Sequence, residues 1–241
     1  EIKEMHNTLV IFKKELKSFF NSPMAYIFLV IFALVTGYFF TNTFFLYNQS
    51  DMRALFSIVP LVYLFFIPAV TMSLIAKEKS VGTIETISTL PIQDRDVVLG
   101  KFLAGYSLII IGLMVTVIHY ITLAFVGTNV DHGAVLSGYF GLIFLGGVYS
   151  AVGIFSSSLT ENSVVAFIIG VFIVLIFFLL DKTLIFVPDA FAGFVQYLSV
   201  DFHLSNISRG VIDTRNLVYF GSVIGFFLFL TTRIVESRKW G

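Results

Sequence analysis

Six long apolar segments constrain the fold of this chain more than any other feature of its sequence. An α-helix needs about 20 apolar residues to cross the hydrocarbon core of a membrane, and the segments are of this order, the fifth near the short limit. The first five contain no Asp, Glu, Lys or Arg. Because the runs are continuous and do not alternate with polar residues, they predict membrane-spanning helices and not barrel strands. The expected spans are residues 24–47, 54–76, 102–126, 135–159, 164–180 and 216–232.

The composition supports a membrane protein and excludes several other classes. Hydrophobic residues make up 57% of the chain and charged residues 12%, whereas soluble domains carry about 25% charged residues, so this chain could not cover a surface that faces water. The formal net charge is zero, which gives no reason to expect a nucleic-acid partner. Cysteine is absent, which excludes disulfides, thiol catalysis and cysteine-based metal sites.

The organisation of the chain predicts a single transmembrane domain over residues 1–241. No tandem repeat or low-complexity linker divides it. The first apolar run is long, is followed by further spans and lacks a small-residue cleavage site, so we expect a retained anchor and not a signal peptide. The printed sequence begins with Glu1, which makes Met5 a candidate start and leaves open whether residues 1–4 are native.

The distribution of basic residues predicts the orientation, because cytoplasmic segments of membrane proteins are enriched in lysine and arginine. With the N-terminus in the cytoplasm, the inner segments hold eleven of the 15 basic residues and the outer segments hold four. Both termini and residues 77–101 are therefore expected on the cytoplasmic side. Residues 181–215 are expected on the extracytoplasmic side.

Residues 7–22 have the pattern of an amphipathic helix, in which apolar residues recur at helical spacing and lysines occupy the other face. This pattern predicts a helix along the cytoplasmic membrane surface, which Pro23 ends before the first span. The alternative is an ordinary anchor whose lysines reach the lipid headgroups. The apolar residues are Leu9, Phe12, Leu16, Phe19 and Phe20, and the lysines are Lys13, Lys14 and Lys17.

Residues 77–101 form a polar segment between the second and third spans that is suited to docking a cytoplasmic partner. Apolar residues three positions apart predict a short helix within it, and carboxylates flank and enter that helix. The alternative is a solvated loop without a docking role, whose lysines and arginines only reflect the general enrichment of basic residues in cytoplasmic segments. The apolar face consists of Ile84, Ile87 and Leu90, the boundaries are Gly82 and Pro91, and the carboxylates are Glu78 and Glu85.

The sequence contains no motif for nucleotide hydrolysis and no expected metal site. Gly100-Lys101 is not the end of a phosphate-binding loop, because Arg95 stands where the first glycine would be needed. The four histidines are scattered. Apart from tyrosines, His119 is the titratable residue inside an expected span. It is a candidate proton relay or substrate contact, and the alternative is a structural imidazole that bonds a neighbouring helix or lies near the outer interface.

Small residues run through the fourth span and prolines interrupt the second. Gly146-x-x-x-Ser150 and Gly147-x-x-x-Ala151 predict close helix packing, either within the chain or against a second copy. Pro60 and Pro68 each remove a backbone donor and predict kinks.

Residues 181–215 are long for a loop and rich in apolar residues, which is typical of a short helical hairpin at the outer mouth. Arg209, Asp213 and Arg215 are candidate docking residues for an extracytoplasmic partner. The alternative is local ion pairing among these residues and Asp201.

Several motifs together resemble the ABC-2 type permeases, and within them the branch associated with gliding motility. The family resemblance is carried by residues 67–72, by Glu78-Lys79-x-x-Gly82-Thr83-x-Glu85, and by residues 91–92 and 99–101. The resemblance to the branch is carried by residues 22–26, 157–162, 208–215 and 236–240.

The resemblance implies an all-α domain of six transmembrane helices with an N-terminal interfacial helix, similar to type V exporters, in the bacterial cytoplasmic membrane. It implies two ABC ATP-binding subunits that hold Mg-ATP, so no cofactor is expected in this chain. It also implies a second permease, identical or a paralogue with an extracytoplasmic domain, and contact with membrane lipids. The coupling residues implied by the family motif are Glu78, Lys79, Gly82, Thr83, Glu85 and Pro91.

Three functions remain open from the sequence. The first is ATP-driven export, and the second is an ATPase-linked complex that transmits force without moving a substrate. The third is a secondary transporter or channel without an ATPase, which the lack of paired ionisable groups in the spans disfavours.

Overall fold

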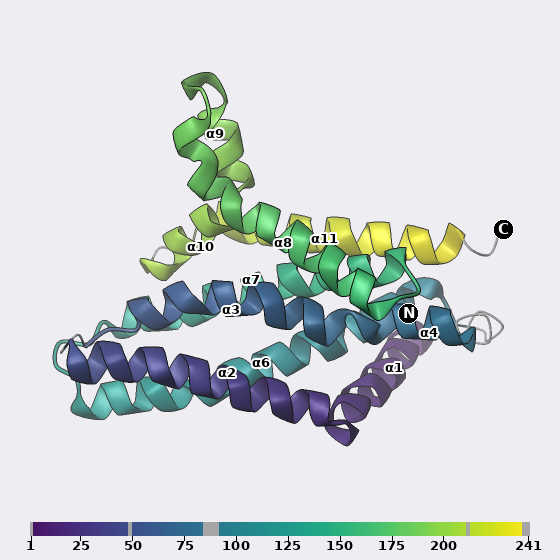
Figure 1. Ribbon diagram of the computed structural model, residues 1–241, viewed down its shortest axis with the longest axis horizontal. Helices are drawn as coiled ribbons and strands as arrows, with labels where there is room; N and C mark the ends of the chain where they lie inside the picture. Colours follow the sequence, from purple (N-terminus) through teal and green to yellow (C-terminus); the bar gives the residue numbers. More distant parts are fainter. Residues whose placement is uncertain (1, 48–49, 84–91, 211–212, 238–241) are drawn as a thin grey trace.

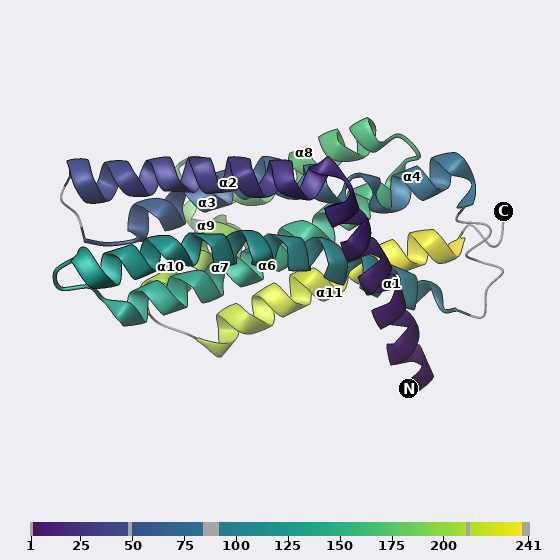
Figure 2. The same ribbon diagram turned by 90° about the horizontal axis from the view of Figure 1, so that it is seen from below.

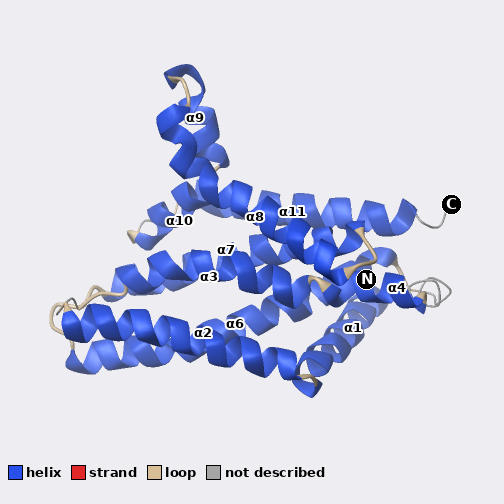
Figure 3. Cartoon of the chain, viewed as in Figure 1, coloured by secondary structure: helices blue, strands red, loops and turns tan. Residues whose placement is uncertain are grey.

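The computed structural model describes residues 2–47, 50–83, 92–210 and 213–237, and every regular element in these ranges is a helix (Figure 3). The helices that are long and apolar enough to cross a membrane are Pro23–Leu46, Arg53–Val81, Asp94–Val126, His132–Leu159, Ser163–Phe186 and Thr214–Ser237. The prediction of an all-α membrane protein with six spans is therefore confirmed.

The helices follow one another along the chain with short connections. The first half contains α1 (Ile2–Asn21), α2 (Pro23–Thr41) with the π-helical turn η1 (Asn42–Leu46), α3 (Arg53–Thr71), α4 (Ser73–Val81) and α6 (Asp94–Val126). The second half contains α7 (His132–Leu159), α8 (Ser163–Thr183) with the 3₁₀ turn η2 (Leu184–Phe186), α9 (Asp189–Leu198), α10 (Val200–Ser208) and α11 (Thr214–Ser237).

The spanning helices lie side by side along the long axis of the molecule (Figure 1). The two termini, α1, α4, the start of α6 and the end of α11 lie at one end, which we call the lysine-rich end. The starts of α3 and α7 lie toward the other end, which we call the opposite end. At the lysine-rich end α1 turns away from the bundle axis and crosses α6 (Figure 2). The segment predicted to be interfacial is thus a separate helix that packs on the bundle.

The second and third spans are among those that extend beyond their predicted bounds. The second continues as α4 to Val81, and the third begins at Asp94 and not at residue 102. Asp94 and Asp96 stand in the first turn of α6, where carboxylates are favoured by the helix dipole, and Val97 is buried directly after them. The described parts of the predicted cytoplasmic loop are therefore helical, while Ile84, Ile87 and Leu90 lie outside the described residues.

Helix α7 lies at the centre of the bundle, where it packs against α3, α4, α6, α8, α10 and α11. Its small residues allow this contact, because a methyl group at Gly153 would overlap the Thr71 side chain on α3. Gly146 faces Ile109 on α6, and Gly147 faces Ile224 on α11. The small residues of the fourth span, which the sequence left open between internal packing and a second copy, therefore serve packing within the chain.

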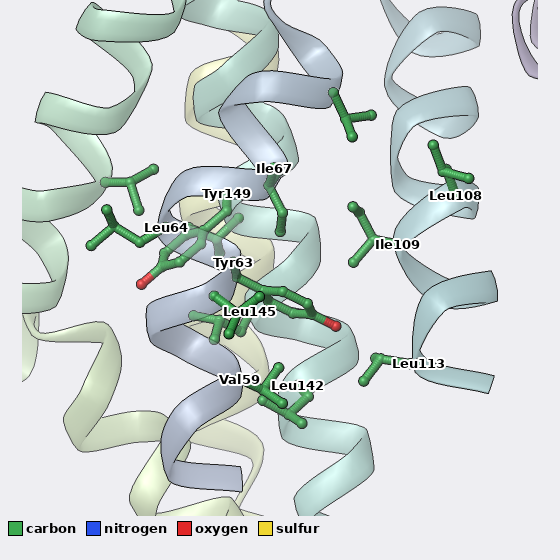
Figure 4. Packing of buried hydrophobic residues seen from close by; sticks show 14 of the residues in the cluster. Val59, Tyr63, Leu64, Ile67, Leu108, Ile109, Leu113, Leu142, Leu145 and Tyr149 are labelled. Atoms are coloured by element: carbon green, nitrogen blue, oxygen red, sulfur yellow. The ribbon is translucent and has the colours of Figure 1, made fainter. Parts of the chain in front are cut away.

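Helices α3, α6 and α7 supply the labelled part of the core (Figure 4), and α2, α8, α10 and α11 add further buried side chains. Tyr63 and Tyr149 are fully buried there among branched aliphatic side chains. Apolar side chains on the outer faces remain exposed, as on α2 and α8, because lipid and not water surrounds a spanning helix. The labelled core residues are Val59, Tyr63, Leu64, Ile67, Leu108, Ile109, Leu113, Leu142, Leu145 and Tyr149.

Candidate functional site

A buried lysine joins three helices at the lysine-rich end. Lys101 on α6 is 1% exposed, and its Nζ donates to Glu78 Oε1 on α4 at 2.7 Å and to Glu15 Oε1 on α1 at 3.0 Å. Lys14 lies at the rim, with its Nζ 3.4 Å from Glu15 and 3.9 Å from Glu78. We call Glu15, Glu78 and Lys101 the charged node.

The sequence around Lys101 brings α1 close enough to form this node. A Cβ atom at Gly100 would lie 2.8 Å from Ile11 Cβ and 2.9 Å from the Thr8 carbonyl oxygen, so only glycine lets α1 lie directly on α6. One turn earlier, Thr8 Oγ1 donates to Asp96 Oδ1 at 3.2 Å. The first turns of α6 thus hold α1 at three places. These are the hydrogen bond from Thr8 to Asp96, the close backbone approach at Gly100, and the bond from Lys101 to Glu15.

Glu15 and Glu78 share the ammonium of Lys101, and their charges balance only when the exposed Lys14 at the rim is counted as the second cation. The Oε2 atom of Glu78 is buried and has no hydrogen-bond partner among the described residues. Removing one partner of a buried ion pair leaves an uncompensated charge and costs about 3–5 kcal/mol. The node therefore resists separation of α1, α4 and α6.

The backbone is interrupted between α3 and α4, four residues after Pro68. The amides of Ile75 and Ala76 donate to Ser157 Oγ on α7, both at 3.0 Å, and Ser157 Oγ donates to the Met72 carbonyl at 2.8 Å. A side chain from another helix thus takes over the bonds that a continuous helix would make along its own axis. This arrangement makes Met72 a hinge point with a defined partner.

The coupling residues proposed from the sequence occupy two environments. Glu78 faces Lys101, and Lys79 is buried and donates to the Ser158 carbonyl at the end of α7. Gly82 ends α4 in the left-handed conformation with φ 74°, and Thr83 Oγ1 donates to the Glu78 carbonyl at 3.3 Å. Val81, Gly82 and Thr83 form an exposed tip, which we call the α4 tip. Glu85 and Pro91 lie outside the described residues.

His119 is a residue of α6, and its side chain faces α2. Its ring stacks on Phe40 with 4.9 Å between the centroids, and it faces Gly37. The residue is half-buried.

The candidate docking residues lie at the start of α11 and the end of α10. Arg209, Asp213 and Arg215 line one hollow of about 430 Å³. Asp213 Oδ1 accepts the backbone amide of Arg215 at 2.8 Å and so caps α11. Asp201 pairs with Lys182 at 2.7 Å and with neither arginine. In the described ranges no three histidines or carboxylates gather to hold a metal ion.

Sequence reasoning missed Glu15, Lys101, Asp96 and Ser157 as site residues. Lys101 carried a signal, because it stands directly before the apolar run of the third span and can be drawn into the same helix. The sequence reasoning used it only in the nucleotide motif and in the family pattern. Glu15 belonged to neither face of the pattern in residues 7–22 and gave no signal of its own.

A family comparison decides the class of this chain. The family described as ABC-2 family transporter protein matches residues 9–208. The chain belongs to the ABC-2 family. It is thus a membrane permease component of an ABC transporter, and the family implies partnership with an ABC ATPase subunit. The match covers the charged node and the hinge and ends before α11. No match was found among curated proteins.

Proposed function

We propose that this permease couples ATP hydrolysis by a separate ABC ATPase subunit to movement of its transmembrane helices, through the α4 tip and the charged node. One observation carries the proposal. The exposed α4 tip lies at the end of the same short helix that carries Glu78, and Glu78 belongs to the charged node that also holds α1 and α6. Displacement of the tip therefore acts on three helices together.

The mechanism follows from the hinge. When the ATPase moves the α4 tip, α4 pivots at Met72, where the Ser157 hydroxyl keeps the broken backbone bonded to α7. Lys101 carries the displacement to α6, and Glu15 carries it to α1. Rigid helices joined at a few bonded positions transmit such movements without unfolding.

The assembly that fits this mechanism has two ABC ATP-binding subunits, which hold Mg-ATP, and two permeases. Residues 1–241 form a single transmembrane domain in it, with α1 along the cytoplasmic membrane surface. The second permease is an identical copy or a paralogue with an extracytoplasmic domain. The motifs at residues 208–215 and 236–240 support membership in the gliding-motility-associated branch and a place in the bacterial cytoplasmic membrane. The complex exports a substrate or transmits force across the membrane, and flux into liposomes separates the two.

A matched pair of valines tests the docking. Val81 at the α4 tip is 66% exposed, and Val126 at the opposite end is 64% exposed. We expect Val81→Asp to reduce both the copurification of the ATPase subunit with the tagged permease and its stimulated ATPase rate. Val126→Asp should leave both unchanged. ATPase recovery and stimulation at wild-type levels in Val81→Asp would overturn the proposal, and so would purification of the permease without any ATPase.

A further inference from the structure

A groove of mixed character lies at the opposite end of the molecule. It consists of two adjoining hollows of about 460 and 450 Å³, between the start of α3, the connection from α6 to α7, and α10. The two hollows share Arg53, Phe56 and Ser208. None of these residues belongs to the charged node or the α4 tip.

Two arginines from distant parts of the sequence meet this groove. Arg53 is the first residue of α3 and Arg209 follows the end of α10, and both are exposed. Neither guanidinium forms an ion pair with any residue in the described ranges. The groove therefore offers two guanidinium groups that have no ion-pair partner in this part of the chain.

The carboxylates that line the groove are already engaged locally. Asp201 accepts from Lys182 at 2.7 Å, Asp51 accepts the amide of Arg53 at 3.2 Å, and Asp131 accepts the amide of Ala134 at 3.0 Å. In addition, Met52 supplies no side-chain cap to α3, so the first-turn amides of that helix, apart from the amide of Arg53, add positive potential to the groove. Asp51 and Asp131 keep their charges, so the donors that an anion can reach are these amides and the two guanidinium groups.

Part of the remaining lining is apolar and lies at the end of a spanning helix. Phe56 from α3 and Leu204 from α10 line the hollow that contains both arginines. Arg53 begins the span Arg53–Val81, so the groove lies at the level where a helix leaves the hydrocarbon core and lipid headgroups begin. A free anion would use the arginines but not this apolar lining.

We propose that this groove binds the phosphate-bearing headgroup of a membrane lipid, with Arg53 and Arg209 on the phosphate and an acyl chain along Phe56 and Leu204. Arginine forks suit phosphate oxygens because they donate two parallel charge-assisted hydrogen bonds. The site goes beyond the proposed coupling function and does not depend on it.

The test measures lipid binding to the purified permease by native mass spectrometry with phosphatidylglycerol as the probe. We expect Arg53→Gln and Arg209→Gln each to weaken binding about tenfold, because a hydrogen bond to a charged group contributes roughly this much, and the double variant about a hundredfold. Arg233→Gln is the matched control, since Arg233 is an exposed arginine on α11 that lines neither hollow of the groove. Unchanged thermal unfolding of the variants shows that they are folded.

Three outcomes would overturn the proposal. Wild-type phosphatidylglycerol binding by a folded double variant is the first. Equal binding of an uncharged glycolipid is the second, because it would show that the phosphate does not contribute to binding. The third is tighter binding of soluble glycerol phosphate, or of a polyglutamate peptide, than of the lipid, because either would assign the groove to a free anion or to an acidic protein segment.

Discussion

Gly153 on α7 faces the side chain of Thr71 on α3 with no room for a methyl group between them. One turn further along α7, Ser157 bonds the backbone where α3 gives way to α4. This close contact between the two helices therefore stands next to the hinge. Tight packing on one side of a hinge keeps the pivot in place while the other side moves.

The contact predicts that Gly153→Ala destabilises the permease. Overpacking of a close contact costs about 1–3 kcal/mol, and here the obstacle is a side chain that is itself bonded to its own helix. Gly225→Ala on α11 is the control, because no atom lies within 4 Å of the added carbon. Thermal unfolding in detergent measures both. Equal stability of the two variants would show that α3 and α7 can separate freely.

The hinge predicts an effect of Ser157→Ala on stability and on coupling. The change leaves the amides of Ile75 and Ala76 buried without this acceptor, and an unsatisfied buried group costs about 1–3 kcal/mol. Ser80→Ala should cost much less, because Ser80 is exposed and bonds only its own helix. Unfolding free energies and ATPase stimulation in lipid nanodiscs check this. Identical behaviour of the two variants would remove the hinge from the mechanism.

The charged node predicts strong energetic coupling between Lys101 and Glu78. Lys101→Met leaves two carboxylates without their buried counter-ion and should cost about 3–5 kcal/mol. Adding Glu78→Gln and Glu15→Gln should restore part of that loss, because the uncompensated charges are then gone. A double-mutant cycle on unfolding free energy measures the coupling. Lys17→Met is the control, since Lys17 is exposed on α1, and additive effects of Lys101→Met and Glu78→Gln would contradict the node.

The packing of His119 predicts that its aromatic ring contributes to stability and that its ability to transfer a proton is not needed for coupling. His119→Phe should keep the stack on Phe40 and change stability by less than about 1.5 kcal/mol, as volume-conserving swaps do. His119→Ala should lose the aromatic pair, which contributes about 0.5–1.5 kcal/mol beyond the buried area. Unfolding and ATPase stimulation are measured for both. Loss of stimulation in a stable His119→Phe variant would assign His119 to proton transfer or substrate contact.

The sequence by itself determined the six spans, because the apolar length needed to cross a membrane is a local property of the chain. It also marked the helix after residue 7 and the break before Pro23, since capping and proline effects act within a few residues. Gly82 was expected at the start of a short helix, whereas its left-handed conformation ends α4. The turn at residues 93–96 indicates a helix that runs on into the third span, and α6 does begin at Asp94.

Only the tertiary structure decided the charged node and the hinge. Glu15, Glu78 and Lys101 come from three helices separated by long stretches of chain, and no pattern in one helix reveals its partner in another. The same holds for Ser157 and Met72, and for Arg53 and Arg209. Helix formation depends on neighbours in the sequence, whereas the pairing of buried polar groups depends on which helix faces meet, and that follows from packing of the whole bundle.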